Sequence, residues 1–113
     1  MDLMGLYVDY RYYAKANLYL PPLSIRRKKL PKGYYGFAYS DNGKWVIEIS
    51  NEFDEITQVE SLQHELGHVL SRSLYHGPKW GIGFSVAYQC WLKFVKEREA
   101  LVFPVKVEPS FFH

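Results

Sequence analysis

The chain has 113 residues, of which 48% are hydrophobic and 18% aromatic, and its formal net charge is +2. These values predict a single folded domain over residues 1–113 and argue against a disordered chain. So small a net charge gives no reason by itself to expect a nucleic-acid partner. The single cysteine, Cys90, excludes an internal disulfide and a zinc ribbon built from cysteines. The sequence shows no run of 18 apolar residues and no signal peptide, so we expect a soluble, cytoplasmic protein.

The first 50 residues are rich in residue types that favour strands. Tyrosine, leucine and valine dominate residues 5–13 and 17–20, so we expect strands in both segments. Pro21 and Pro22 follow, and two prolines suit an edge strand or a bend better than a central strand.

A basic segment follows the prolines and carries five of the fourteen basic residues of the chain, namely Arg26, Arg27, Lys28, Lys29 and Lys32. One interpretation is contact with DNA phosphates through the four residues from Arg26 to Lys29. The other is a solvated, charged strand end that protects a sheet edge from aggregation. We favour the second interpretation.

Residues 40–43, with the sequence Ser-Asp-Asn-Gly, predict a tight turn. Asn-Gly between two strand-like segments is a strong hairpin signal, so we expect strands at residues 34–39 and 44–50. In the second strand, Ile47 and Ile49 should share one face of the sheet.

Residues 57–74 have the pattern of an amphipathic helix. Thr57 and Glu60 are spaced as a capping box at its start. An apolar stripe recurs at helical spacing and consists of Val59, Leu62, Leu66, Val69 and Leu70. At about 100° per residue, this stripe lies roughly opposite His64 and His68, which should therefore face away from the core, towards a cleft.

An H-E-x-x-H motif begins at His64 and ends at His68, and His76 stands eight positions further on. Positions i and i+4 share one face of a helix, so the imidazoles of His64 and His68 can bind one metal ion. His76 offers a third nitrogen and leaves one tetrahedral position open, which is the arrangement of catalytic zinc. Glu65 stands between the first two ligands and is the candidate general base.

After a short turn over residues 71–77, Gly77-Pro78 resembles a helix start. A second helix is predicted because apolar residues follow at helical spacing, namely Trp80, Phe84, Ala87, Trp91 and Phe94 or Val95. Gly81 and Gly83 should allow this helix to approach the first one closely, and Cys90 should be a core thiol. Residues 102–107 are expected to form a short edge strand or an extended tail, and His113 a mobile end.

From the hairpin to Trp80, over about residues 34–95, the chain resembles the SprT-like zinc metallopeptidases, the family that includes Spartan. The matching positions are His64, Glu65, His68, His76-Gly77-Pro78-Lys79-Trp80 and the strand at residues 45–50. The resemblance implies an α+β, minimal zincin-like fold: a small antiparallel sheet packed with the H-E-x-x-H helix and a second, C-terminal helix. It also implies zinc as the cofactor and a polypeptide as the substrate. The loop from His68 to His76 is shorter than in Spartan, and one cysteine cannot build the zinc ribbon of some relatives.

Two other zincin patterns offer a different third ligand. The metzincin pattern needs glycine and histidine where this chain has Ser71 and Leu74, so it does not fit. The gluzincin pattern takes a glutamate from a downstream helix, and Glu97 and Glu99 are available. Both stand in a run of alternating charges typical of a solvated helix end, so His76 is the preferred third ligand.

These residues predict a zinc-dependent protease. Zinc lowers the pKa of its bound water to about 7, and Glu65 can take the proton of that water and deliver it to the leaving amine. Tyr75, Arg72 or a tyrosine of the first 50 residues is expected to donate to the oxyanion, and the sequence does not choose among them. The substrate would be an extended polypeptide added along a sheet edge. The alternatives are a zinc-containing module that binds nucleic acid or protein without proteolysis, and a metal-free scaffold.

Overall fold

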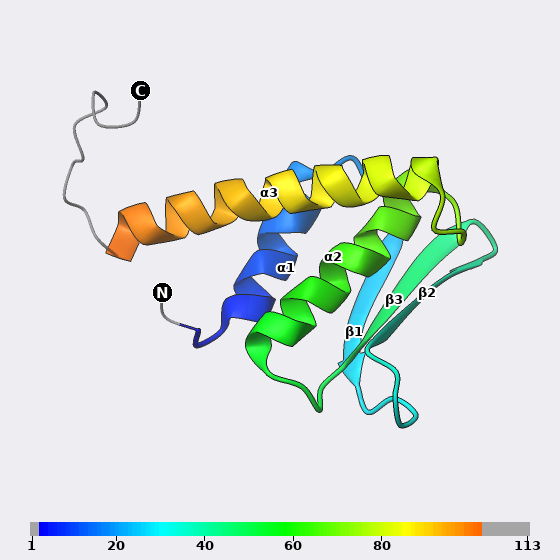
Figure 1. The fold of residues 1–113 in the computed structure, drawn as a ribbon, viewed down its shortest axis with the longest axis horizontal. Helices are drawn as coiled ribbons and strands as arrows, with labels where there is room; N and C mark the ends of the chain where they lie inside the picture. Colours follow the sequence, from blue (N-terminus) through cyan, green and yellow to red (C-terminus); the bar gives the residue numbers. More distant parts are fainter. Residues whose placement is uncertain (1–2, 103–113) are drawn as a thin grey trace.

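A computed structural model describes residues 3–102 of the chain. As expected, the fold is α+β, and three helices lie on one side of a three-stranded sheet (Figure 1). Helix α2 is central, because it contacts two strands of the sheet as well as both other helices. In chain order the elements are α1 (Leu6–Asn17), β1 (Leu23–Lys28), β2 (Gly36–Asp41), β3 (Lys44–Ser50), α2 (Glu55–Ser71) and α3 (Pro78–Val102).

Helix α1 stands where a strand at residues 5–13 was expected, and residues 18–20 form neither helix nor strand, so the predictions of strands at 5–13 and 17–20 are wrong. Its buried side chains recur at the spacing of one helix face and are Leu6, Tyr7, Tyr10 and Ala14. Burial of this face overrides the preference of tyrosine for strands. The hydroxyl of Tyr10 donates to the carbonyl of Ala87 on α3 at 3.0 Å, so the buried phenol has a partner inside the core.

The sheet is mixed, with the strand order β1-β3-β2. Strands β2 and β3 form the expected antiparallel hairpin, and its turn holds Asn42 and Gly43 at φ values of 53° and 78°. Strand β1 pairs with β3 in parallel, with Ile25 opposite Ile47, so the expectation of a wholly antiparallel sheet is wrong. The reason lies in the order of the strands: the chain passes from β1 to the far edge as β2, and β3 then returns between them.

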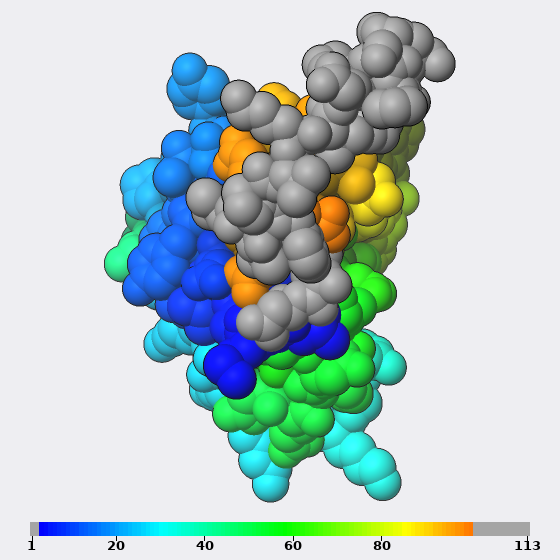
Figure 2. Space-filling model, turned by 90° about the vertical axis from the view of Figure 1, so that its left-hand side faces the viewer, coloured from blue at the N-terminus to red at the C-terminus, as the bar shows by residue number. Residues whose placement is uncertain are grey.

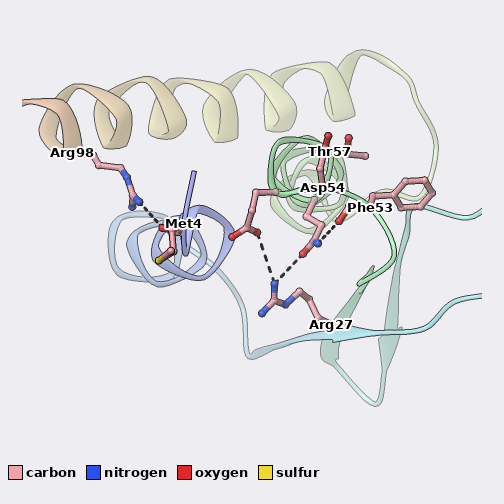
Figure 3. Close-up of polar contacts among 8 residues, drawn as sticks. Met4, Arg27, Phe53, Asp54, Thr57 and Arg98 are labelled. Carbon is pink, nitrogen blue, oxygen red and sulfur yellow. Dashed lines mark hydrogen bonds and ion pairs between the residues drawn. The ribbon is translucent and has the colours of Figure 1, made fainter. Parts of the chain in front are cut away.

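Arg27 of β1 ties the sheet to two helices. Its guanidinium donates to the side-chain oxygen of Gln58 at 3.1 Å and lies 3.9 Å from the carboxylate of Glu55 (Figure 3). The same group lies 4.8 Å from the ring centroid of Tyr7 on α1. One basic side chain therefore holds α1 and the start of α2 over β1.

Helix α2 begins two residues earlier and ends three residues earlier than the predicted segment 57–74. Asp54 is the N-cap, because its carboxylate accepts from the backbone N–H of Thr57 at 2.8 Å (Figure 3). The capping box predicted for Thr57 and Glu60 is therefore wrong: aspartate is a strong N-cap and starts the helix before Thr57. The apolar stripe is buried as predicted, with Leu70 only partly so.

Helix α3 runs across α1 and α2 (Figure 1). Near the far end of α3, Arg98 donates to the carboxylate of Asp9 at 2.6 Å. It also donates to the carbonyl of Met4 at 2.9 Å (Figure 3). Figure 2 shows this side of the molecule, where the surface of α1 lies beside that of α2. Cys90 is buried in the core as predicted. Val102 belongs to α3, while the rest of the segment predicted at 102–107 and His113 lie outside the described residues.

Two glycines allow α2 and α3 to touch through their backbones. A Cβ added at Gly83 would lie 2.5 Å from the carbonyl oxygen of Gly67, and one added at Gly67 would lie 2.7 Å from the indole nitrogen of Trp80. A Cβ at Gly81 would meet nothing within 4 Å. Of the two glycines of α3 expected to allow close packing, only Gly83 does so.

This contrast makes a stability prediction. Gly83→Ala should lower the free energy of unfolding by about 1–3 kcal/mol or more, because the contact at Gly83 is with backbone atoms that cannot move aside. Gly81→Ala should raise it by about 0.5–1 kcal/mol through the better helix propensity of alanine. Urea unfolding followed by circular dichroism measures both. Equal effects of the two substitutions would contradict the close helix contact.

Candidate metal centre

Three histidine side chains converge at the junction of α2 and α3. The Nε2 atom of His76 lies 2.9 Å from Nε2 of His64 and 3.1 Å from Nε2 of His68. The candidate ligand atoms of the three residues all lie within 4.8 Å of one another, so they are close enough to bind one metal ion. The structure thus brings together the three residues proposed as ligands from the sequence.

The local backbone explains this convergence. His64 and His68 stand one turn apart on α2, and the helix ends after Ser71. Arg72 then adopts a left-handed conformation, with φ of 51°, which reverses the chain direction. The short connection that follows carries His76 back over the helix face. The connection is compact because only eight positions separate His76 from His68 in the sequence.

Ser73 fixes the orientation of His68. Its backbone carbonyl lies 2.8 Å from Nδ1 of His68. A carbonyl can only accept, so this hydrogen bond requires the proton of His68 to be on Nδ1. The lone pair of Nε2 is then directed at the other two imidazoles, and a carbonyl partner of this kind is typical of metal-binding histidines.

The imidazoles are held in the form that binds metal. Burial lowers the pKa of His64, and the imidazoles of His68 and His76 lower it further. Burial also lowers the pKa of His68, where the hydrogen bond to Ser73 acts in the opposite direction and His76 lowers the pKa again. Both rings are therefore neutral at neutral pH, which is the state that coordinates a metal. A single proton on Nε2 of His76 cannot serve both neighbours well, whereas one divalent cation satisfies all three nitrogens. The donor set thus fits a metal ion.

Glu65 lies beside the histidines and is only 7% exposed. Its side chain packs against the first residue of β2: a Cβ added at Gly36 would lie 3.3 Å from Cγ of Glu65. Burial raises the pKa of Glu65 to about 7. A cation held by the histidines acts in the opposite direction, because it favours the carboxylate.

Trp80 supports all three histidines from α3. Its indole N–H donates to the backbone carbonyl of His64 at 3.1 Å. The ring centroid lies 5.1 Å from those of His64 and His76 and 6.0 Å from that of His68. Sequence reasoning assigned Trp80 to core packing, although its fixed distance from His76 was a usable signal. The hydrogen bond between Ser73 and His68 has no signal in the sequence, because Ser73 makes it through its backbone carbonyl.

A cleft of about 650 Å³ opens beside His64 and Glu65. The aromatic residues of its lining are Tyr34, Tyr35 and Phe53, and Tyr35 stacks on Phe53 with ring centroids 4.4 Å apart. A hollow of about 690 Å³ between α1 and α3 has neither Glu65 nor any of the three histidines in its lining. The cleft beside the histidines is therefore the one that suits a substrate.

The candidate oxyanion donors differ in their surroundings. The guanidinium of Arg72 donates to the carbonyls of Val69 and Leu70 and so caps the end of α2. Tyr75 is exposed and does not line the cleft. Tyr34 and Tyr35 do line it, which makes the early tyrosines the best-placed donors.

Neither alternative ligand joins the histidines, because the group of candidate ligands contains neither Glu97 nor Glu99. The basic residues considered for DNA contact all lie beside carboxylates: Arg26 and Lys28 beside Glu48, Arg27 beside Glu55 and Lys29 beside Glu52, at 3.5–3.9 Å. These pairs favour the interpretation of a charged strand end over that of a DNA contact.

The chain matches no protein-family model, no curated protein and no solved structure. The resemblance to SprT-like metallopeptidases therefore stays a prediction that rests on the motif residues. Within residues 3–102, no helix is both long enough and apolar enough to cross a membrane.

Metal content tests the ligand set directly. Wild-type protein supplied with zinc should hold about one zinc per chain, and His76→Ala should lose most of it because two imidazoles remain. Glu97→Gln and Glu99→Gln are the controls and should keep the metal. Elemental analysis after gel filtration gives the ratio. Zinc retained by His76→Ala but lost by a glutamate variant would contradict the three-histidine site.

Proposed function

We propose that the protein is a zinc-dependent metalloprotease of the minimal zincin type. His64, His68 and His76 would hold the zinc, and Glu65 would act as the general base. The observation that carries the proposal is the convergence of three histidine Nε2 atoms next to a buried glutamate, Glu65, which lines a cleft together with His64. Three imidazoles with an open position are the ligand set of catalytic rather than structural zinc.

When bound, zinc would supply a Lewis acid for the scissile carbonyl and lower the pKa of water at the site. The residues of the chain would do the rest. Glu65 takes a proton from the attacking water and returns it to the leaving nitrogen, and a cation beside it favours the carboxylate form that can accept the proton. Tyr34 or Tyr35 would donate a hydrogen bond to the developing oxyanion.

The edge of the sheet indicates how a substrate would lie. Strand β2 is an edge strand, and it begins at Gly36, where the backbone meets the side chain of Glu65. An extended polypeptide that pairs with this edge would lie beside Glu65. Its backbone groups would make the contacts, so its side chains need no particular sequence. An unfolded polypeptide is thus the substrate class that the geometry favours.

The alternative is a zinc-containing binding module without proteolytic activity. In such a module the metal would only stabilise the fold, as structural zinc does, and its ligand positions would all be filled by protein. The histidine group contains three ligands, and a cleft adjoins it. Glu65 distinguishes the two functions, because a structural metal has no use for a buried carboxylate at an open cleft.

Glu65→Gln should abolish proteolysis and leave metal binding intact. The substitution keeps the shape of the side chain but removes the base, so the cleavage rate should fall by about 10²–10⁴-fold. Release of fluorescent fragments from unfolded, labelled casein measures the rate, and elemental analysis measures the zinc. The matched control is Glu99→Gln on the exposed side of α3, which should cleave like the wild type. Zinc-loaded wild type that cleaves no unfolded protein would contradict the proposal.

A further inference from the structure

A second hollow, of about 350 Å³, lies between α2 and α3 on the other side of the α2 residues that line the cleft. Its lining includes Val59, Gln63, Phe84, Tyr88 and Trp91. The volume is at the small end of the range for ligand sites. It suits one large side chain better than a cofactor.

Gln63 is a largely buried residue of the hollow, and its side-chain amide makes no hydrogen bond to any residue between 3 and 102. It is 4% exposed. Gln58, on the same helix and 6% exposed, makes two side-chain hydrogen bonds. The oxygen of Gln58 accepts from Arg27 at 3.1 Å, and its nitrogen donates to the carbonyl of Phe53 at 2.6 Å. The nitrogen and oxygen of Gln63 are not among the fully buried atoms without a partner, so they stay accessible and can offer a donor and an acceptor to a ligand in the hollow.

A peptide group is such a ligand. It offers one N–H and one C=O, which match the oxygen and the NH₂ of a glutamine side chain. Gln63 directly precedes the proposed ligand His64 on α2. Glu60 lies in the lining of both the cleft and the hollow and forms the boundary between them.

Stacked aromatic rings connect the hollow to the histidines. Trp80 stacks on Phe84 at 5.2 Å, and Phe84 stacks on Tyr88 at 6.3 Å. Trp80 is the residue that contacts all three histidines. From Trp80 to Tyr88 the helix rises about 12 Å, which an extended peptide covers in roughly three to four residues.

The charge of the hollow indicates which polymer it binds. The lining includes one carboxylate, that of Glu60, and no lysine or arginine among the described residues. Aromatic rings also stack on nucleobases, but a nucleic acid would bring phosphates that need basic side chains. An apolar side chain on a polypeptide needs none.

We propose that this hollow is a substrate-anchoring site for polypeptides. The amide of Gln63 pairs with one peptide group of the bound chain, and the wall of Phe84, Tyr88 and Trp91 covers one large apolar side chain. That the bound chain is a substrate rests on the proposed protease function. The binding itself does not. The site would make the protein prefer segments in which an apolar residue lies a few residues from the cleaved bond.

Binding to the inactive, zinc-loaded Glu65→Gln protein tests the site apart from catalysis. The probes are two fluorescein-labelled 12-residue peptides of glycine and serine, one with a central phenylalanine and one with alanine there. Fluorescence anisotropy should show the phenylalanine peptide binding about tenfold tighter or more, from burial of one aromatic side chain. Adding Tyr88→Ala should weaken only the phenylalanine peptide. Adding Gln63→Met should weaken both peptides by about 2–10-fold, because the lost contact is with the backbone.

Urea unfolding separates this role from a structural one. Gln63→Met should leave the unfolding midpoint unchanged or raise it, since no internal hydrogen bond is lost, whereas Gln58→Met should lower it. Equal affinity for the two peptides, or no effect of either Tyr88→Ala or Gln63→Met, would overturn the proposal. So would displacement of the phenylalanine peptide by an equal concentration of oligothymidylate, which would assign the hollow to nucleobases. If wild type bound the phenylalanine peptide without cleaving it, the anchoring site would stand and the protease function would fail.

Discussion

The backbone contact between Gly67 of α2 and Gly83 of α3 is the constraint on which the site depends. With no Cβ on either side, the two helices approach more closely than side chains permit. This closeness puts Trp80, near the start of α3, directly against the histidines of α2. It also shortens the gap that the connecting loop must cross, so that His76 can meet the other two ligands. The three candidate ligands are thus positioned by helix packing as much as by the motif itself.

The opposite side of α2 is held by the sheet, and this second contact defines the chemistry. Gly36 lets the start of β2 come against Glu65, so the carboxylate is enclosed between a strand and its own helix. Arg27 fixes the beginning of the same helix to β1 and α1. A helix clamped from both sides has little freedom to rotate. His64, Glu65 and His68 therefore keep their relative positions, which the proposed hydrolysis would require.

The parts that sequence reasoning predicted correctly are those with short-range signals. Asn-Gly at the turn predicts the hairpin, and the apolar stripe predicts helix α2. The H-E-x-x-H motif and His76 predict the histidine group. The failures are long-range. Tyrosine-rich α1 is a helix because one of its faces is buried against α2 and α3. Strand β1 pairs in parallel because β3 returns between β1 and β2. The contact between Ser73 and His68 could not be predicted either, because Ser73 contributes its backbone carbonyl, which every residue type has.

Gln58 and Gln63 show how one helix divides structural and binding roles along its length. Near the start of α2, the amide of Gln58 is paired at both ends and stabilises the fold. One turn and a half further on, next to the candidate ligand His64, Gln63 is a similarly buried residue, but its amide bonds to no residue within 3–102. That amide belongs to the lining of the hollow, where it can offer a donor and an acceptor to a bound peptide group. The same helix that carries the proposed catalytic residues would then also hold the chain on which they act.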